Sequence, residues 1–141
     1  MATRSNIAMC YPDGSVRSVY VHWDGYPSGV GKTLLDHYSD EDKLIALLDL
    51  GDISSLGPEI GLRNSFERPD PYFTVFYGRD RGEENTSAKT YTDVDDFLTR
   101  SISCVDYVYL YDGGKWRCFD NDGNELDLSK EINEEIEQVN D

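Results

Sequence analysis

The sequence has few cysteines, few basic residues and no long apolar run. Its three cysteines, Cys10, Cys104 and Cys118, are odd in number and form no C-x-x-C pair, so neither a zinc site nor a disulfide framework is indicated. No stretch approaches about 18 apolar residues, and no apolar region as long as that of a signal peptide follows the first six residues. We therefore expect neither a membrane span nor a secretory signal, but a cytosolic protein with reduced thiols.

Charge of one sign dominates the chain. It has 28 carboxylates against 13 Lys and Arg, a net charge of −15, and 17 of those acids but only 6 of the bases follow residue 79. The negative electrostatic field of such a chain repels nucleic acid and anionic membranes. It favours binding to a basic partner, and it would allow the protein to imitate the phosphate backbone of a nucleic acid. The alternative is that the acidity only keeps a small protein soluble.

Aromatic residues are plentiful, which a disordered chain would not show. Ten Tyr, five Phe and two Trp in 141 residues indicate one folded domain over residues 1–141, large enough to bury a core without metal or disulfides. We expect residues 129–141 to form a terminal acidic helix, because Ile132, Ile136 and Val139 repeat at helical spacing between glutamates.

Turn residues and periodicity predict the remaining elements. Hairpins are expected around Pro12–Ser15 and Asp112–Gly114, the second continuing through Asp122-Gly123 into a further strand. Helices are expected over residues 30–38, over residues 40–50 with a Ser39 or Asp40 cap and a Gly51 stop, and from Thr92 to Arg100. A strand is expected at Tyr72–Tyr77, followed by a polar loop over residues 78–89.

This element order, β-β-α-α-β-α-β-β(-β)-α, predicts an α+β fold. Hairpins at both ends favour an antiparallel sheet, with an αα-hairpin and further helices packed on one face. Trp23 and Phe76 are expected to be core residues, each costing about 3 kcal/mol or more on truncation to Ala.

The segment from Tyr26 to Thr33 resembles a phosphate-binding Walker A loop. Its Gly31-Lys32-Thr33 ending matches, but Tyr26 stands at the first glycine position, and Gly25 lies one place too early. The preceding strand also looks like part of a hairpin rather than a parallel βαβ strand. The alternative is a Gly-rich turn that opens a helix and leaves Lys32 in solvent. The residues that would hold a nucleotide phosphate here are Gly29, Gly31, Lys32 and Thr33.

Arg79 and Arg81 directly follow an aromatic strand. Arginine beside an aromatic face can hold a phosphate or purine, which makes both residues candidate ligands for an anion. Pairing with neighbouring carboxylates of the same chain is the favoured alternative.

No constellation predicts catalysis or a metal site. His22 and Asp24 share one side of a strand end, and Cys10 or Cys104 is a nominal nucleophile for His22 or His37, but nothing orients a third member. The run Asp120–Glu125 looks like a calcium loop but places its glycine too early, so a hairpin turn explains it better. We predict no catalytic residue, no metal and no cofactor.

Four strings resemble a family of small acidic accessory proteins encoded by bacteriophages and prophages. They are Arg4–Ile7, His22–Tyr26, Ser54–Gly61 and Tyr77–Glu83, within residues 4–90. The family carries no assigned activity, so the resemblance transfers no site residue. It implies a phage product in the host bacterial cytoplasm, where small acidic proteins often inhibit host defence or sequester signalling nucleotides.

The leading hypothesis is a non-enzymatic inhibitor of an anti-CRISPR or anti-restriction type. It would bind a host protein with a basic nucleic-acid-binding surface, without contacting nucleic acid or membrane itself. The expected contact residues are acidic side chains and strand tyrosines of the C-terminal half: Asp93, Asp95, Asp96, Tyr109, Tyr111, Glu131, Glu134, Glu135 and Glu137. The alternatives are a nucleotide-binding module or sponge for an anionic signalling nucleotide, and a P-loop-like nucleotidase.

Overall fold

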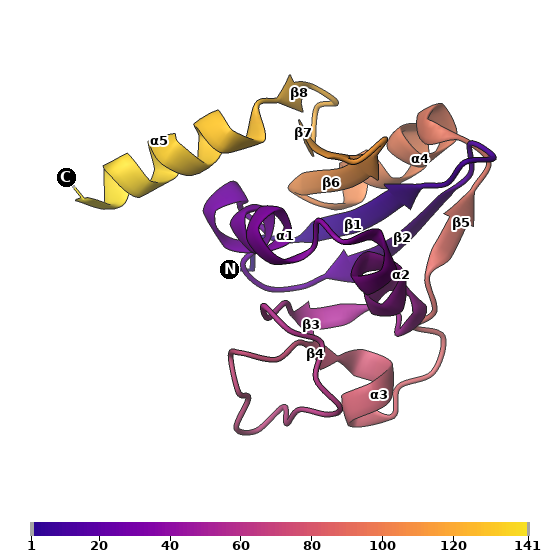
Figure 1. Cartoon of the computed structure of the whole chain (residues 1–141), viewed down its shortest axis with the longest axis vertical. Helices are drawn as coiled ribbons and strands as arrows, with labels where there is room; N and C mark the ends of the chain where they lie inside the picture. Colours follow the sequence, from indigo (N-terminus) through magenta and orange to yellow (C-terminus); the bar gives the residue numbers. More distant parts are fainter. Residues whose placement is uncertain (1, 141) are drawn as a thin grey trace.

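The computed structural model describes residues 2–140, with the side chains of residues 2–138, and builds one sheet from eight strands (Figure 1). The strands are β1 Ser5–Cys10, β2 Val16–Val21, β3 Ile53–Ser55, β4 Val75–Phe76, β5 Lys89–Tyr91, β6 Tyr107–Asp112, β7 Lys115–Asp120 and β8 Glu125–Leu126. The predicted hairpins β1–β2 and β6–β7 and the further strand β8 are all present.

The sheet is mixed, so the prediction of an antiparallel sheet is wrong in part. Its order is β4-β3-β2-β1-β6-β7-β8, and β5 pairs with β2 beside this path. Strand β1 runs parallel to β6, and β2 runs parallel to β3. The physical reason lies in the connections, because the long helical segment between β2 and β3 is a crossover, which parallel neighbours require.

Helical segments cover both faces of this sheet. They are the π-helical turn η1 Pro27–Gly31, α1 Lys32–His37, α2 Glu41–Asp49, α3 Tyr77–Arg81, α4 Val94–Ser101, the 3₁₀ turn η2 Ile102–Cys104 and α5 Leu128–Asn140. The α+β class is confirmed. The αα-hairpin expected for α1 and α2 remains a prediction. No helix in the described part of the chain is long and apolar enough to cross a membrane.

The larger core lies on the face of the sheet that α1 and α2 cover (Figure 1). Odd-numbered residues of β1 and β6 point into it, among them Ile7 and Tyr109, and they meet Leu34 of α1, Leu48 of α2 and Leu128 of α5. The period-2 alternation of the strands places these side chains on one face.

A smaller core lies on the opposite face, where even-numbered residues point. Ala8, Val108 and Leu110 pack there against Phe97 of α4 and Tyr91 of β5. The expectation of helices on one face only is therefore wrong, because α4 packs behind the sheet and buries this second apolar set.

Two helix starts follow the capping rules. Asp40 caps α2 by accepting the N–H of Asp42 at 3.0 Å, and Gly51 follows the helix with a positive φ of 86°. Asp93, rather than the predicted Thr92, caps α4 by accepting the N–H of Asp96 at 2.7 Å. A carboxylate at this position accepts an otherwise unpaired N–H.

The aromatic run at Tyr72–Tyr77 is mostly not a strand. Only Val75–Phe76 forms β4, and the expected loop begins with helix α3. The reason is Asp80, whose carboxylate accepts the Phe76 N–H at 2.8 Å and turns the chain into the helix. Phe76 is fully buried, as predicted, whereas Trp23 is 47% exposed, so its assignment to the core is wrong.

Helix α5 follows the predicted stripe only at its beginning. Leu128 and Ile132 are buried, but Ile136 is 38% exposed, and the Val139 side chain lies outside the described residues. Figure 1 shows the helix extending past the edge of the sheet. Most of its surface therefore faces solvent.

Candidate functional site

The Gly-rich turn η1 stands in a βαβ unit, contrary to the expectation from sequence. Strand β2 precedes it, and β3, at the end of the crossover, is parallel to β2. The turn nevertheless lacks free N–H groups for a phosphate. Gly29 donates to the Tyr26 carbonyl at 2.9 Å, Val30 donates to the Asp24 carbonyl at 2.8 Å, and the Lys32 N–H points back to carbonyls of η1.

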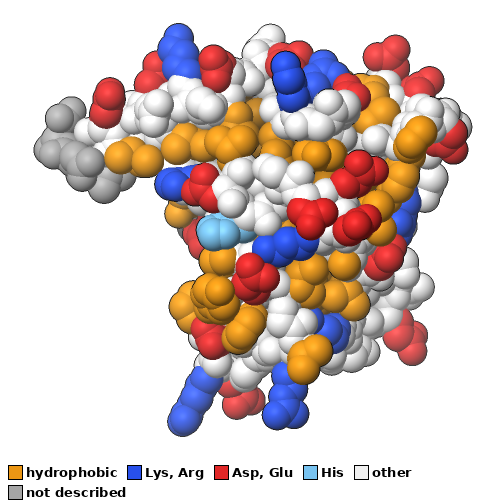
Figure 2. Space-filling view, viewed as in Figure 1, with side chains coloured by type: hydrophobic (Ala, Val, Ile, Leu, Met, Phe, Trp, Pro, Cys, Tyr) orange, Lys and Arg blue, Asp and Glu red, His pale blue; other side chains and the backbone are white. Residues whose placement is uncertain are grey.

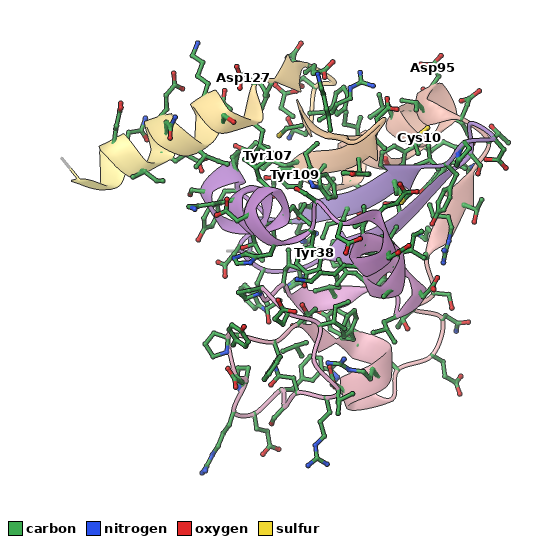
Figure 3. The ribbon with its side chains drawn as sticks, viewed as in Figure 1. Cys10, Tyr38, Asp95, Tyr107, Tyr109 and Asp127 are labelled. Carbon is green, nitrogen blue, oxygen red and sulfur yellow. The ribbon has the colours of Figure 1, made fainter. Side chains whose placement is uncertain are left out.

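The glycines of η1 are required by close packing. A Cβ on Gly29 would lie 2.3 Å from the Asp24 carbonyl oxygen, and one on Gly31 would lie 2.8 Å from Leu128 Cδ1 and 3.0 Å from the Tyr109 ring. Tyr109 reaches under the turn from β6 and donates its hydroxyl to the Gly25 carbonyl at 2.6 Å (Figure 3). Burial raises the pKa of this phenol far above its usual range.

A carboxylate of α5 already meets the first turn of this segment. Glu135 Oε1 accepts the Ser28 N–H at 2.6 Å. Lys32 is exposed and pairs with Asp36, one helical turn on. The structure therefore supplies intramolecular partners for the groups that a Walker A loop offers to phosphate.

Arg79 holds a loop. All five of its N–H donors are used: two bonds to Asp80, one to the Thr74 carbonyl and two to the carbonyls of Ile60 and Gly61. Arg81 pairs with Glu83 at 3.0 Å and lies over the rings of Phe66 and Tyr77. The intramolecular alternative for these two arginines is thus what the structure shows, and Arg79 has no donor left for a ligand.

Two expected contact residues lie inside the protein. Tyr109 is fully buried, and Tyr111 is 7% exposed and donates to the Ser39 carbonyl at 3.1 Å. Their assignment to a partner-binding surface is wrong, because both point into the larger core and anchor loops of their own chain.

The acidic residues divide into structural and free groups. Asp93 and Asp96 hold the start of α4, and hydrogen bonds, first from the Thr92 N–H, lower the pKa of Asp96 despite some burial. Asp95 points outward, as Figure 3 shows. On α5, Glu134 and Glu137 are exposed, whereas Glu131 and Glu135 are half-buried.

A groove that the sequence did not predict runs along the second face of the sheet. Its wider part is an open pocket of about 470 Å³, lined by Arg4, His22, Trp23, Cys104, Asp106 and Asn121 among others. A narrower pocket of about 190 Å³ adjoins it at Cys104 and Val105, and its lining includes Asn6, Ser18, Tyr20, Asp52, Lys89 and Arg100. We call the two pockets together the sheet-face groove.

Titratable groups in the sheet-face groove are linked to one another. The Tyr20 hydroxyl lies 2.8 Å from His22 Nδ1, and Asp52 accepts the Tyr20 N–H at 3.0 Å. Burial raises the pKa values of both Asp52 and Tyr20, and the Arg4 charge partly offsets the rise for Tyr20. His22 is therefore partnered by Tyr20, not by Asp24 as the sequence suggested.

Comparison with known proteins gives no match. No family model, no curated protein and no solved structure matches this chain. Function is therefore argued from the residues and their geometry.

The remaining chemical candidates hold structural positions. Cys118 is buried, which raises its pKa to about 12, and burial also raises the pKa of Cys10. Asp120 accepts N–H groups of Asp122 and Asn124, so its carboxylate closes the β7–β8 turn. Among the described residues, no group of three or more His, Cys, Asp or Glu side chains is placed to hold a metal ion.

Proposed function

We propose that the protein is a non-enzymatic binding protein whose acidic C-terminal helix engages a basic surface of another protein. The observation that carries the proposal is that the carboxylates of α5 have no basic partner within the described part of the chain. In the described part of the chain, none of Glu131, Glu134 and Glu137 forms an ion pair, and α5 extends past the sheet edge where a partner can reach it.

One further carboxylate adds to the negative charge of α5. Asp127 lies just before the helix, at the outer rim in Figure 3. Figure 2 shows acidic side chains on the outer side of α5 and an apolar row on the side facing the body. A charged surface presented in this way steers a basic partner by long-range attraction that salt screens.

Several basic residues, by contrast, are neutralised within the chain. Seven of them form ion pairs, and one of these, Arg117, bridges Asp112 and Glu125 at 2.9 Å each. The net charge of −15 therefore resides mainly on carboxylates that have no basic partner in the described part of the chain. This pattern favours imitation of a phosphate backbone over a surface of balanced charges.

The resemblance to phage accessory proteins supplies the biological setting of the proposal. In that setting the partner is a host defence protein whose basic surface normally binds nucleic acid, and the site of action is the host bacterial cytoplasm. The protein itself would perform no chemistry.

A pull-down from bacterial lysate tests the proposal. The wild type, the variant Glu134→Gln/Glu137→Gln and the control Glu41→Gln/Glu67→Gln are compared at low and high salt, with mass spectrometry of the eluates. The control removes two charges, as the α5 variant does. Its two glutamates, Glu41 and Glu67, are exposed and distant in sequence from α5. We expect a basic protein retained by the wild type and the control at low salt, and lost from the α5 variant.

The nucleotide alternatives at η1 gain no support from the geometry. The N–H groups of the turn are hydrogen-bonded within the chain, and Lys32 pairs with Asp36. A flat thermal-melting panel with nucleotides in the Trp23→Ala variant, whose sheet-face groove lacks its exposed aromatic side chain, would exclude a nucleotide site at η1.

A further inference from the structure

The second face of the sheet is only half covered. Around Ala8 and Val108 it is apolar and lies under Phe97 of α4. Along the same strands, toward the start of β1 and the end of β2, the residues on this face become polar: Asn6, Ser18, Tyr20 and His22. Central strands carry such residues where no apolar layer covers them, so this half of the face is built to meet polar groups.

The sheet-face groove does not share the acidic excess of the protein. Its lining holds Arg4, Lys89 and Arg100 against the two carboxylates Asp52 and Asp106, and because Arg100 pairs with Asp96 the lining is close to neutral. The whole chain has 28 acids for 13 bases. A nearly neutral groove on a strongly acidic protein repels an anionic ligand less than the rest of the surface does.

Arg4 has its guanidinium available. Its main chain is fixed, since its N–H donates to Asp106 Oδ2 at 2.9 Å and its carbonyl accepts from Asp106 N at 2.9 Å. No carboxylate of the described residues forms an ion pair with its side chain, which is exposed and lines the wider pocket. Guanidinium donors in this state match a phosphate.

An aromatic wall stands beside Arg4. Trp23 is 47% exposed, and the His22 ring meets it edge-on with the ring centroids 4.7 Å apart. His22 Nδ1 is engaged by Tyr20, so the Nε2 atom is the nitrogen left for another contact. An exposed indole held at a fixed angle offers a face on which a flat ring can stack.

We propose that the sheet-face groove binds a nucleoside phosphate. The base stacks on Trp23, the phosphate lies beside Arg4, and Asp106 and Asn121 accept or donate at the polar edge of the base, while Lys89 adds positive charge from the adjoining narrower pocket. The wider pocket alone, at about 470 Å³, is within the size range of small-molecule sites. The proposal does not depend on α5, which lies on the other face of the sheet.

The test uses isothermal titration and thermal melting of the full chain. The probes are the four ribonucleoside 5′-monophosphates and diphosphates, with adenosine, ribose 5-phosphate and inorganic phosphate as partial ligands. We expect at least one nucleotide to bind and to raise the melting temperature. Each partial ligand should bind at least tenfold more weakly, because it lacks either the ring or the phosphate.

Matched variants locate the ligand. Arg4→Gln and Trp23→Ala alter exposed side chains and should each weaken binding of that nucleotide by about tenfold or more. Arg63→Gln, an equal charge change at an exposed residue outside the groove lining, should bind as the wild type does. Lys89→Gln is the second groove variant should Arg4→Gln fold poorly.

Two outcomes would overturn the proposal. One is that no nucleotide in the panel binds the wild type. The other is that a nucleotide binds but Arg4→Gln, Trp23→Ala and Lys89→Gln all retain its affinity, which would place the ligand elsewhere. Neither result bears on the proposed contact through α5, because the α5 variant Glu134→Gln/Glu137→Gln keeps every groove residue.

Discussion

At the scale of single residues, neighbours in the Gly-rich turn have different roles. Gly31 is buried between Leu128 and Tyr109, whereas Lys32 points outward to Asp36. A phosphate-binding loop would need both residues for function, while a packing turn needs only the glycine for stability.

The first prediction compares Gly31→Ala with Lys32→Ala. A methyl group on Gly31 would stand 2.8 Å from Leu128 Cδ1, so we expect a loss of about 1–3 kcal/mol in the free energy of unfolding. Lys32→Ala should change it by no more than about 0.5 kcal/mol. Urea denaturation measures both. ATP hydrolysis by the wild type that disappears in Lys32→Ala would contradict a purely structural turn.

The side-chain predictions that failed share one cause. Alternation correctly predicted which side of β6 Tyr109 and Tyr111 occupy, but it carries no information on what covers that side, and it does not extend to Trp23 beyond the end of β2. Tyr109 and Tyr111 lie beneath helices, and Trp23 stands just beyond the end of β2, where cover stops. The groove residues Arg4 and Asp106, 102 positions apart in sequence, could not be joined without the β1–β6 pairing.

The second prediction concerns Asp80, whose side chain is fully buried beside Arg79. Burial alone would raise the pKa of Asp80, but hydrogen bonds from Arg79 and from the N–H groups of Phe76 and Asn64 lower it overall. Asp80→Asn should cost about 3 kcal/mol or more, because it leaves Arg79 without its carboxylate.

The pH dependence of Asp80 has a definite sign. Because its pKa is lower in the folded than in the unfolded state, the stabilisation is fully present above the ordinary pKa of 3.8 and is lost as pH falls through the folded value. Urea melts of the wild type from pH 6 downward should show this loss, and Asp80→Asn should show a smaller one. Equal pH profiles for the two proteins would rule out the assigned role.

At the scale of elements, local signals predicted the hairpins and the cap of α2, but placed the cap of α4 one residue early, at Thr92 instead of Asp93. Asp40 and the Asp112–Gly114 turn act as their residue types require. Parallel pairing was missed because the β1–β6 and β2–β3 contacts leave no trace in local periodicity. The helix α3 was missed because the aromatic run Tyr72–Tyr77 favours a strand in the sequence. In the structure the Asp80 carboxylate accepts the Phe76 N–H, and the chain becomes helical from Tyr77.

The third prediction separates the docking of α5 from its exposed face. Glu135 accepts the Ser28 N–H, so Glu135→Ala should cost about 1–3 kcal/mol by leaving a half-buried N–H unpaired. Glu134→Ala, one residue away and exposed, should stay within about 0.5 kcal/mol. Hydrogen exchange of the α5 and η1 amides reports the same difference locally. Equal stability of both variants would mean that Glu135 does not hold the helix.

At the scale of the whole molecule, the separation of charge was predictable by counting, but its division into roles was not. The acidic excess after residue 79 is visible in the sequence. Only the structure distinguishes carboxylates that cap helices or close turns, such as Asp93 and Asp120, from those left in solvent, such as Glu134 and Glu137.

The last prediction tests whether that solvent-exposed charge is functional. Glu134→Gln/Glu137→Gln removes two charges with little change of shape and leaves the structural Glu135 intact. With about 0.2–1 kcal/mol for each exposed ion pair, affinity for the captured basic partner should fall by about 0.4–2 kcal/mol, or about 2- to 30-fold. The loss should shrink at high salt. The melting temperature should hold or rise slightly, because self-repulsion within an acidic protein falls.

The control Glu41→Gln/Glu67→Gln should bind as the wild type does, since its charges lie away from α5. If the α5 variant keeps full affinity at low salt, the helix serves solubility alone, and the partner must contact another surface of the molecule.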